Sequence, residues 1–264
     1  MNLNLKDKVV LIAGGAGEKG SISETILQSL SLEGAIPAVI DIADRGRLYI
    51  DQLHAENRSG LFVKTDVTDP TAVESAIKEI VAKYNRIDVV INIVGVNDSV
   101  GLNASLEEFM DSIKLNLATY FLTVKYALPH LKQSRGNILN IGSKVAQTGQ
   151  GGTSGYAAAK GGVLALTREW AVDLIDYGIR SNAVIIAECW TPSYDAWIQT
   201  LDNSQGKLNS ILSKIPLEKR MTTPEEIADT VLFLISDRSS HTNGQHVFVD
   251  GGYTHLDRAL LSNQ

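Results

Sequence analysis

The stretch VVLIAGGAGEKGSISE, residues 9–24, carries the signals that decide the fold. Its first five residues, Val9–Ala13, are all apolar and predict a buried β-strand. The glycines in residues 14–20 allow a tight turn, and the sequence SISE at residues 21–24 matches a capping box, which predicts a helix that begins directly after the turn. A strand, a glycine-rich loop and a helix in this order predict that phosphate groups bind at the helix N-terminus.

Alternating strand and helix patterns continue along the rest of the chain. Short apolar runs are typical of parallel strands that are buried on both faces, and longer helical patterns lie between them. The predicted strands are Val9–Ala13, Pro37–Asp41, Leu61–Thr65, Val89–Ile93, Asn137–Ile141, Arg180–Ile185 and His246–Val249. The predicted helices are Ile22–Glu33, Thr71–Tyr84, Leu106–Lys132, Tyr156–Tyr177 and Pro224–Ser236. This alternation predicts an α/β fold with a doubly wound parallel sheet of about seven strands and helices on both faces.

The whole chain, residues 1–264, is expected to form a single domain. Only six prolines occur, glycines are spread along the sequence, and no linker, repeat or low-complexity tract is present. One polar segment, residues 195–215, is interpreted as part of an insertion near residues 193–216 that covers the substrate. Two alternatives stay open for this segment: a solvated pair of surface helices, or a mobile lid over a ligand cleft.

Composition excludes several classes of protein. An apolar content of 44% and a charged content of 20% over 264 residues are typical of globular proteins and exclude wholesale disorder. The net charge of −6, without any block of like charge, argues against nucleic acid or a membrane surface as the partner. The single cysteine, Cys189, cannot form an intramolecular disulfide. Because neither a signal sequence nor a long apolar run is present, we expect a cytoplasmic protein.

The glycine loop and the end of the second strand predict a dinucleotide site. Backbone groups at Gly14, Gly17, Gly20 and Ser21 are expected to contact the pyrophosphate. Asp41, which ends the second predicted strand, is placed to accept hydrogen bonds from an adenosine ribose. Because a carboxylate there repels a 2′-phosphate, NAD is favoured and NADP remains possible. The alternative interpretation is a glycine turn without a ligand.

The loop after the third strand reaches the same edge of the predicted sheet. Asp66 is a candidate hydrogen-bond partner for an adenine amino group, and Val67 follows it directly. The alternative is that Asp66 caps a turn before Pro70.

Tyr156 and Lys160 form a candidate catalytic pair. Residues four apart lie on one face of a helix, so the ammonium group can lie close to the phenol. A nearby cation lowers the pKa of a tyrosine from about 10, and the phenolate can then act as a general base. Ser143 precedes Tyr156 by thirteen residues and is expected to hydrogen-bond the substrate oxygen. Taken alone, the tyrosine and lysine would be interpreted as two surface residues of a helix.

These motifs together resemble the short-chain dehydrogenase/reductase family over nearly the whole chain. The matching residues are Gly14, Gly20, Asp66, Asn92, Gly95, Asn116, Ser143, Tyr156, Lys160, Asn182 and Thr191. The resemblance implies a Rossmann-type fold and a catalytic set of Asn116, Ser143, Tyr156 and Lys160. It further implies that Lys160 binds the nicotinamide ribose, that Asn116 holds a water, and that Thr191 contacts the carboxamide. Asn92 and Gly95 are expected to contact the cofactor as well.

The sequence departs from the family pattern at three places. Glu18 stands where the family usually has the middle glycine of the first loop. The run Asn92-Ile93-Val94-Gly95 lacks one of the usual amides, and Ile186-Ala187 replaces the usual Pro-Gly after the sixth strand. A carboxylate at position 18 is compatible with a pyrophosphate only if its side chain turns outward.

Within this family the nearer resemblance is to the bacterial L-fucose dehydrogenases, and the long run from Asp250 to Leu260 carries most of it. That resemblance implies oxidation at C1 of a 6-deoxyhexose to the lactone. Polar and aromatic side chains at the carboxyl ends of the predicted strands also favour a sugar over a steroid or an acyl chain. Besides Ser143 and Tyr156, the expected substrate contacts are Asn97, Asp98, Lys144, Gln150, Glu188 and Trp190, with Gln150 and Glu188 the strongest candidates.

Two other functions stay open at this point: a 3-oxoacyl-thioester or other ketone reductase on the same scaffold, and a dinucleotide-binding protein without catalysis. The resemblance implies a homotetramer, in which the segment Tyr253–Leu260 either packs at a subunit interface or forms a solvated tail. His255 has no companion histidine or cysteine cluster, so no metal site is expected.

Overall fold

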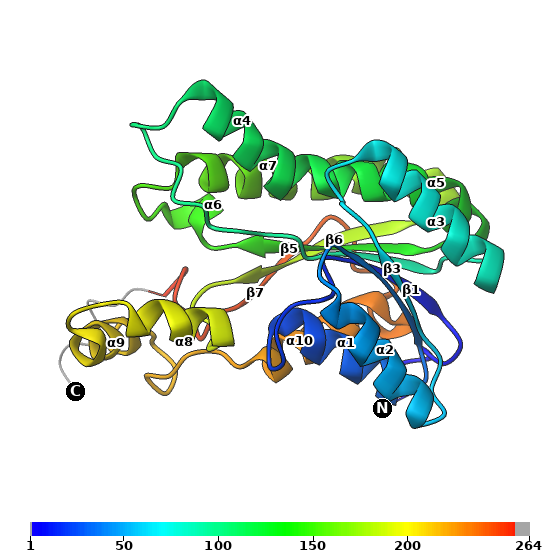
Figure 1. Cartoon of the computed structure of the whole chain (residues 1–264), viewed down its shortest axis with the longest axis horizontal. Helices are drawn as coiled ribbons and strands as arrows, with labels where there is room; N and C mark the ends of the chain where they lie inside the picture. The colour runs from blue at the N-terminus through cyan, green and yellow to red at the C-terminus, as the bar shows by residue number, and fades with distance from the viewer. Residues whose placement is uncertain (1, 257–264) are drawn as a thin grey trace.

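The computed structural model describes residues 2–256 and confirms the predicted sheet. Seven parallel strands lie in the order β3-β2-β1-β4-β5-β6-β7 (Figure 1). They are β1 (Val9–Ala13), β2 (Ile36–Asp41), β3 (Leu61–Lys64), β4 (Val89–Asn92), β5 (Asn137–Ser143), β6 (Arg180–Ile186) and β7 (His246–Val249). The strand order reverses between β1 and β4, and such a switch point opens a crevice at the carboxyl ends of the strands.

Helices cover both faces of the sheet, as Figure 1 shows. One face carries α1 (Ile22–Leu32), α2 (Arg45–Ala55) and α10 (Pro224–Ile235). The other face carries α3 (Pro70–Tyr84), α4 (Leu106–Ile113), α5 (Thr119–Ser134) and α7 (Ser154–Asp173). A hydrophobic core lies on each side of the sheet, so the strands are buried on both faces as their apolar runs predict.

The structure differs from the predicted helices in two ways that affect the site. The predicted helix Leu106–Lys132 is divided, because residues Lys114–Ala118 form a π-helical turn between α4 and α5. Such turns are rare and recur at functional sites. Helix α2 was not predicted, since Gly46 and the polar residues of this segment weaken its pattern. At the end of β5 the ladder continues as far as Ser143, paired with Ile186.

The predicted insertion forms a pair of helices, α8 (Pro192–Gln199) and α9 (Ser204–Leu212). Figure 1 shows both of them beyond the end of the sheet, away from the helices that cover its faces. Three short elements complete the described chain: α6 (Val145–Thr148) and 3₁₀ turns at Ile175–Tyr177 and Asp237–Ser239. The segment Tyr253–Leu260, expected either at a subunit interface or as a solvated tail, is described only as far as residue 256, and residues 257–260 lie outside the described residues.

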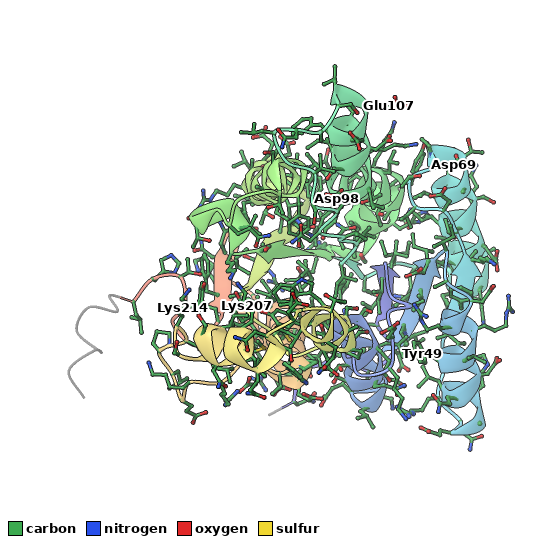
Figure 2. All side chains as sticks on the ribbon, turned by 60° about the vertical axis from the view of Figure 1, so that its left-hand side comes forward. Tyr49, Asp69, Asp98, Glu107, Lys207 and Lys214 are labelled. Atoms are coloured by element: carbon green, nitrogen blue, oxygen red, sulfur yellow. The ribbon has the colours of Figure 1, made fainter. Side chains whose placement is uncertain are left out.

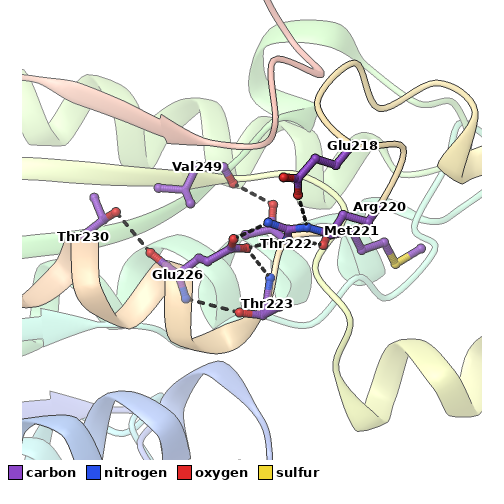
Figure 3. A network of polar contacts seen from close by, with 8 residues as sticks. All are labelled: Glu218, Arg220, Met221, Thr222, Thr223, Glu226, Thr230 and Val249. Carbon is purple, nitrogen blue, oxygen red and sulfur yellow. Dashed lines mark hydrogen bonds and ion pairs between the residues drawn. The ribbon is translucent and has the colours of Figure 1, made fainter.

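A charged network fixes the segment between α9 and α10 (Figure 3). The Arg220 guanidinium bridges the carboxylates of Glu218 and Glu226, at 2.6 Å from each. Glu226 also accepts from the backbone N–H of Thr223 and completes a capping box at the start of α10. The neighbouring residue Thr222 pairs through its backbone with Glu188 and Trp190, so the network holds the segment that follows β6.

Within residues 2–256, no helix is long and apolar enough to cross a membrane.

Candidate active site

A cavity of about 570 Å³ lies at the carboxyl ends of the strands. Its volume is in the range of pockets that bind cofactors and substrates. The structure brings most of the predicted cofactor and catalytic residues together in its wall. These residues are Gly14, Gly17, Ser21, Asp41, Asp66, Val67, Gly95, Tyr156, Lys160 and Thr191.

The glycine loop requires glycine at two of its positions. Gly14 has a φ of +86°, and a Cβ atom there would lie 2.8 Å from a methyl carbon of Val94. A Cβ atom at Gly17 would lie 2.5 Å from the hydroxyl oxygens of Ser21 and Ser23. The loop therefore keeps its backbone exposed to the cavity. Glu18 is exposed and does not line the cavity, which is the outward orientation that a bound pyrophosphate requires.

Ser21 is the N-cap of α1, as predicted, but the capping box is incomplete. Its hydroxyl accepts from the backbone N–H of Glu24 at 3.3 Å. The Glu24 carboxylate accepts instead from the backbone N–H of Gly20 at 3.1 Å, because the N–H of Ser21 already donates to the carbonyl of Glu18. Gly20 is exposed and does not line the cavity, so its expected cofactor contact is not supported by its position.

Asp41 lies at the cavity wall and supports the glycine loop. Its carboxylate accepts from the backbone N–H groups of Ala16 and Ala43, both at 2.9 Å. Two residues of α2 support the same loop: Arg45 donates to the carbonyl of Ala16 at 3.1 Å, and Tyr49 donates to the carbonyl of Gly17 at 2.8 Å. Arg45 also lines the cavity, and it was not predicted as a site residue because helix α2 was not predicted.

Asp66 caps a turn, which was one of the two alternatives, and its contact with an adenine stays a prediction. It lines the cavity, and one of its oxygens accepts from the N–H and the hydroxyl of Thr68 at 2.9 and 2.8 Å. The backbone hydrogen bond is the main reason that the pKa of Asp66 is lowered. Its other oxygen remains available to a ligand.

Asn92 has a structural position that the resemblance did not indicate. Its side chain is fully buried and donates to the side-chain oxygen of Asn140 at 2.9 Å, and Asn140 in turn donates to Thr167. Asn92 does not line the cavity. The amide of Asn92 therefore links β4 to β5 within the core, and the expected contact of Asn92 with the cofactor stays a prediction.

Tyr156 of α7 lines the cavity and is hydrogen-bonded to Ser143 at the end of β5, which is not itself in the cavity wall. A hydrogen bond from Ser143 favours the phenolate form of Tyr156, but burial outweighs it, and the negative charge of Asp98 acts in the same direction as burial. The pKa of Tyr156 is consequently raised. The prediction that the pKa of Tyr156 is lowered overall is wrong for this structure, because burial has the largest effect.

Lys160 is 2% exposed, and its Nζ atom donates to three oxygens. They are the hydroxyl of Tyr120 at 2.8 Å, the carbonyl of Ile141 at 3.0 Å and the carbonyl of Val94 at 3.2 Å. Burial lowers the pKa of Lys160 from 10.5 to about 7. Nζ lies 5.7 Å from the centre of the Tyr156 ring, so a positive charge on Lys160 is close to the phenol.

Asn116 lies within the π-helical turn and is fully buried. Its side-chain oxygen accepts from the backbone N–H of Val96 at 2.8 Å, and its amide nitrogen is 3.4 Å from the hydroxyl of Ser112. Asn116 thereby fixes the segment that follows β4 and carries Gly95. Its expected contact with a water molecule stays a prediction.

The predicted substrate residues Lys144 and Glu188 contact each other in a group centred on Glu188. One carboxylate oxygen of Glu188 pairs with the ammonium of Lys144, and the other accepts from the hydroxyl of Tyr194 at 2.6 Å. The Lys144 ammonium also lies 4.1 Å from the centre of the Tyr253 ring. We call Lys144, Glu188, Tyr194 and Tyr253 the Glu188 cluster. Tyr194 and Tyr253 were not predicted as site residues, and only the structure shows that α8 and the segment after β7 bring them here.

Aromatic rings extend the Glu188 cluster along α8. The Tyr194 ring lies 6.2 Å from that of Trp190 and 5.2 Å from that of Trp197, the latter in an edge-to-face arrangement. Trp190 is 40% exposed, so its ring can still contact a ligand. Thr191, whose hydroxyl accepts from the N–H of Tyr194, caps α8 and lines the cavity.

The remaining predicted substrate residues, Asn97, Asp98 and Gln150, lie in exposed loops. Asp98 lies on the segment that leads to α4, and Figure 2 shows it above the region of α8 and α9, where Lys207 and Lys214 are labelled. Its effect on the pKa of Tyr156 shows that it is near the catalytic candidates. The structure brings neither Asn97 nor Gln150 into the wall of the cavity.

This arrangement provides the parts of a proton-transfer site beside a long cavity. A tyrosine hydroxyl is paired with a serine hydroxyl, a buried lysine lies behind the tyrosine, and a helix N-terminus and an acidic strand end lie farther along the cavity. Such a set can bind a dinucleotide and move a proton to or from a substrate oxygen.

Comparison with known proteins supports this interpretation. A family model described as enoyl-(acyl carrier protein) reductase matches residues 15–254. A 3-oxoacyl-[acyl-carrier-protein] reductase from Thermotoga maritima is 35% identical over 257 residues, which cover 95% of this chain and 99% of that protein. An L-fucose dehydrogenase from Oryctolagus cuniculus is 33% identical over 251 residues, which cover 93% of this chain and 84% of that protein.

Among solved structures, that of the Cj0485 dehydrogenase matches with a TM-score of 0.92 and 37% identity, and the match covers 98% of both chains. The relative named for L-fucose is mammalian, and a bacterial reductase named for acyl substrates is equally similar, so similarity establishes the family rather than the substrate. The similarity to these enzymes also argues against the alternative of a dinucleotide-binding protein without catalysis. The chain belongs to the short-chain dehydrogenase/reductase family and is an oxidoreductase that acts on alcohol or ketone groups.

Proposed function

We propose that this enzyme oxidises C1 of an aldose, a 6-deoxyhexose such as L-fucose, to the lactone with NAD as the oxidant. The observation that carries the proposal is the Glu188 cluster beside the catalytic candidates. Lys144 directly follows Ser143, and its ammonium and the Glu188 carboxylate are almost completely buried, with side chains 12% and 11% exposed. Buried charges and phenols of this kind suit a ligand rich in hydroxyl groups, and the exposed Trp190 ring suits the apolar face of a sugar.

The cavity fits a nicotinamide dinucleotide. The glycine loop and the start of α1 would hold the pyrophosphate, Asp41 the adenosine ribose, and Lys160 and Thr191 the nicotinamide end. When bound, the cofactor supplies the acceptor for a hydride. Asp41 favours NAD because its charge repels a 2′-phosphate, and the guanidinium of Arg45 in the same wall leaves NADP as a weaker alternative.

The residues of the chain would then handle the proton of the anomeric hydroxyl. Ser143 orients that hydroxyl, and Tyr156 as phenolate accepts its proton while the C1–H bond gives up a hydride and the C1–O bond becomes a carbonyl. The Ser143 hydrogen bond and the charge of Lys160 near the ring reduce the cost of ionising a buried phenol. Asn116 supports the segment that carries Gly95 and completes the set.

A second function is supported by the Thermotoga relative, whose name describes reduction of a 3-oxoacyl group. The same Tyr156 and Ser143 would then protonate and orient a ketone oxygen. The charged Glu188 cluster is a poor match for an acyl chain, which needs apolar walls, and we therefore place this function second.

The test is a substrate panel with purified enzyme. L-fucose, L-galactose, D-arabinose and L-rhamnose are each supplied with NAD and with NADP, and a 3-oxoacyl thioester is supplied with the reduced cofactors, while the absorbance of the reduced nicotinamide is followed. We expect reduction of NAD with at least one aldose. Turnover of the thioester with no turnover of any aldose would overturn the proposal.

We also propose from the family resemblance that the enzyme is a cytoplasmic homotetramer. Light scattering after gel filtration would test the number of subunits.

A further inference from the structure

The strongest feature that the family assignment does not explain is Tyr120, which lies behind Lys160. Tyr120 is 1% exposed and lies in the first turn of α5, directly after the π-helical turn. Its hydroxyl oxygen lies 2.8 Å from Lys160 Nζ, 2.9 Å from the carbonyl of Val94 and 3.0 Å from the carbonyl of Ile141. The same two carbonyls also accept from Nζ.

The four atoms form a closed polar group inside an apolar core. An ammonium has three protons and no lone pair, and here each proton has one acceptor: one hydroxyl and two carbonyls. The phenol has a single proton, so it donates to one carbonyl at a time and accepts from Lys160 with its lone pair. Removing the hydroxyl would leave the ammonium with two partners in a site without solvent.

The position of Tyr120 depends on the π-helical turn. Asn116 in that turn accepts from the N–H of Val96, and Tyr120, four residues later, donates to the carbonyl of Val94. The two side chains therefore hold the segment after β4 at both ends, with Gly95 of the cavity wall between them. Through the carbonyl of Ile141, Tyr120 also reaches β5, two residues before Ser143.

We propose that Tyr120 is a positioning residue for Lys160: its hydroxyl fixes the ammonium between the ends of β4 and β5 and keeps it charged. This inference rests on the proposed role of Lys160 and is independent of the identity of the substrate. The titratable groups in contact with Lys160 are two phenols, Tyr120 of α5 and Tyr156 of its own helix α7. Among the hydrogen-bond partners of Lys160 Nζ within residues 2–256, the Tyr120 hydroxyl is the side-chain group and the other two are backbone carbonyls.

The direct test is the titration of Lys160 in wild-type enzyme and in Tyr120→Phe, which lacks one oxygen atom. The lysine ε-carbons are labelled with ¹³C, their shifts are followed against pH, and the Lys160 signal is assigned by its loss in Lys160→Met. Burial sets the wild-type midpoint at about 7. We expect a midpoint about one pH unit lower in Tyr120→Phe, because an ammonium loses one of its acceptors. An unchanged midpoint would overturn the inference.

A second measurement covers catalysis. For the substrate with the highest activity, kcat/KM is measured against pH for wild type, Tyr120→Phe and the matched control Tyr126→Phe, which changes another tyrosine of the same helix. We expect kcat/KM at neutral pH to fall about tenfold in Tyr120→Phe. The alkaline limb of its profile should move to lower pH, because Lys160 then loses its proton at lower pH, and the control should not change.

A purely structural role for Tyr120 would instead lower the melting temperature and leave the profile and the Lys160 midpoint unchanged. If no substrate of the panel is turned over, the lysine titration still decides the inference, and the failure then concerns the proposed function alone.

Discussion

The two ends of the sheet each hold a cation among neutral oxygens, half-buried at one end and buried at the other, and they use it differently. At the amino end, Arg180 of β6 donates to the carbonyl of Leu234 and the hydroxyl of Ser239, both at 3.1 Å, and to the carbonyl of Ser236 at 3.1 Å. At the carboxyl end, Lys160 of α7 donates to one phenol and two carbonyls. Neutral oxygens therefore surround both cations, but Arg180 connects parts of the structure at one end, whereas Lys160 belongs to the candidate active site at the other.

The difference follows from the chemistry of the two side chains. Burial lowers the pKa of both, but a guanidinium keeps its charge at every physiological pH, whereas burial brings the pKa of Lys160 to about 7. Arg180 can therefore act as a permanent link between β6 and the segment after α10. Lys160 can change its charge beside Tyr156, which suits a site where a proton moves.

The largest effect is expected at the carboxyl end, from Tyr156→Phe. This change removes the proposed base, so we expect kcat to fall by about 10²- to 10⁴-fold, because positioned proton transfer contributes that much to a rate. Cofactor binding, measured by the fluorescence of the reduced nicotinamide, should remain within a few-fold of wild type. Near-normal turnover would show that another group accepts the proton.

Replacing each of these two cations by methionine should change stability in opposite directions. Arg180→Met leaves several carbonyl and hydroxyl groups without their donor and should lower the free energy of unfolding by about 2–4 kcal/mol. Lys160→Met removes a charge that burial disfavours and should raise it by about 1 kcal/mol at neutral pH, while abolishing most activity.

The pH dependence of the Lys160→Met effect provides the check. The folded pKa of about 7 lies below the ordinary value of 10.5. Between these two values the unfolded wild type holds a proton that the folded state has lost, so wild-type stability rises with pH. Denaturant unfolding at several pH values should show that the free energy of unfolding of Lys160→Met exceeds that of wild type by less and less as the pH rises between these two pKa values. A constant difference would contradict a titrating, buried Lys160.

A smaller effect concerns the choice of cofactor at Asp41. Asp41→Asn removes the charge that repels a 2′-phosphate, so the ratio of kcat/KM with NADP to that with NAD should rise about tenfold. Asp44→Asn is the matched control, because Asp44 is exposed and pairs with Lys64 at 2.7 Å, outside the cavity wall. An equal ratio of kcat/KM with NADP to that with NAD in the two variants would show that Asp41 does not contact the ribose of the bound cofactor.

The smallest effect is expected in the Arg220 network (Figure 3). The hydrogen bond that Arg220 donates to Glu226 is the main reason that the pKa of Glu226 is lowered from 4.5. Because the pKa of Glu226 is lower in the folded than in the unfolded protein, its ionised form stabilises the folded state at a pH above the unfolded pKa. This stabilisation is lost as the pH falls through the folded pKa. Melting temperatures from about pH 6 to about pH 3 should therefore fall more for wild type than for Glu226→Gln. Glu225→Gln, one residue earlier in the same turn, should behave like wild type.

The sequence predicted the sheet and most of the site because both depend on local patterns. Buried parallel strands are continuous apolar runs, so the seven predicted strands match the structure closely. Gly14, Asp41 and Tyr156 were found because each follows a predicted strand or begins a helix, and the parallel sheet brings those points to one edge.

What the sequence could not predict depends on contacts between distant elements. The π-helical turn leaves no recognisable pattern, so Tyr120 remained an ordinary apolar position of a helix. Tyr194 reaches Glu188 because of the way the chain turns between the end of β6 and the first turn of α8. The pKa of Tyr156 depends on burial by surrounding elements, and spacing alone therefore gave the wrong direction.

A crystal structure of the complex with NAD tests the central claim most directly. The claim is that the cavity at the carboxyl ends of the strands binds the dinucleotide with its reactive ring beside Tyr156. We predict the adenosine ribose against the Asp41 carboxylate and the nicotinamide within reach of both the Tyr156 hydroxyl and Lys160. A dinucleotide bound elsewhere, or a nicotinamide ring turned away from Tyr156, would contradict the account.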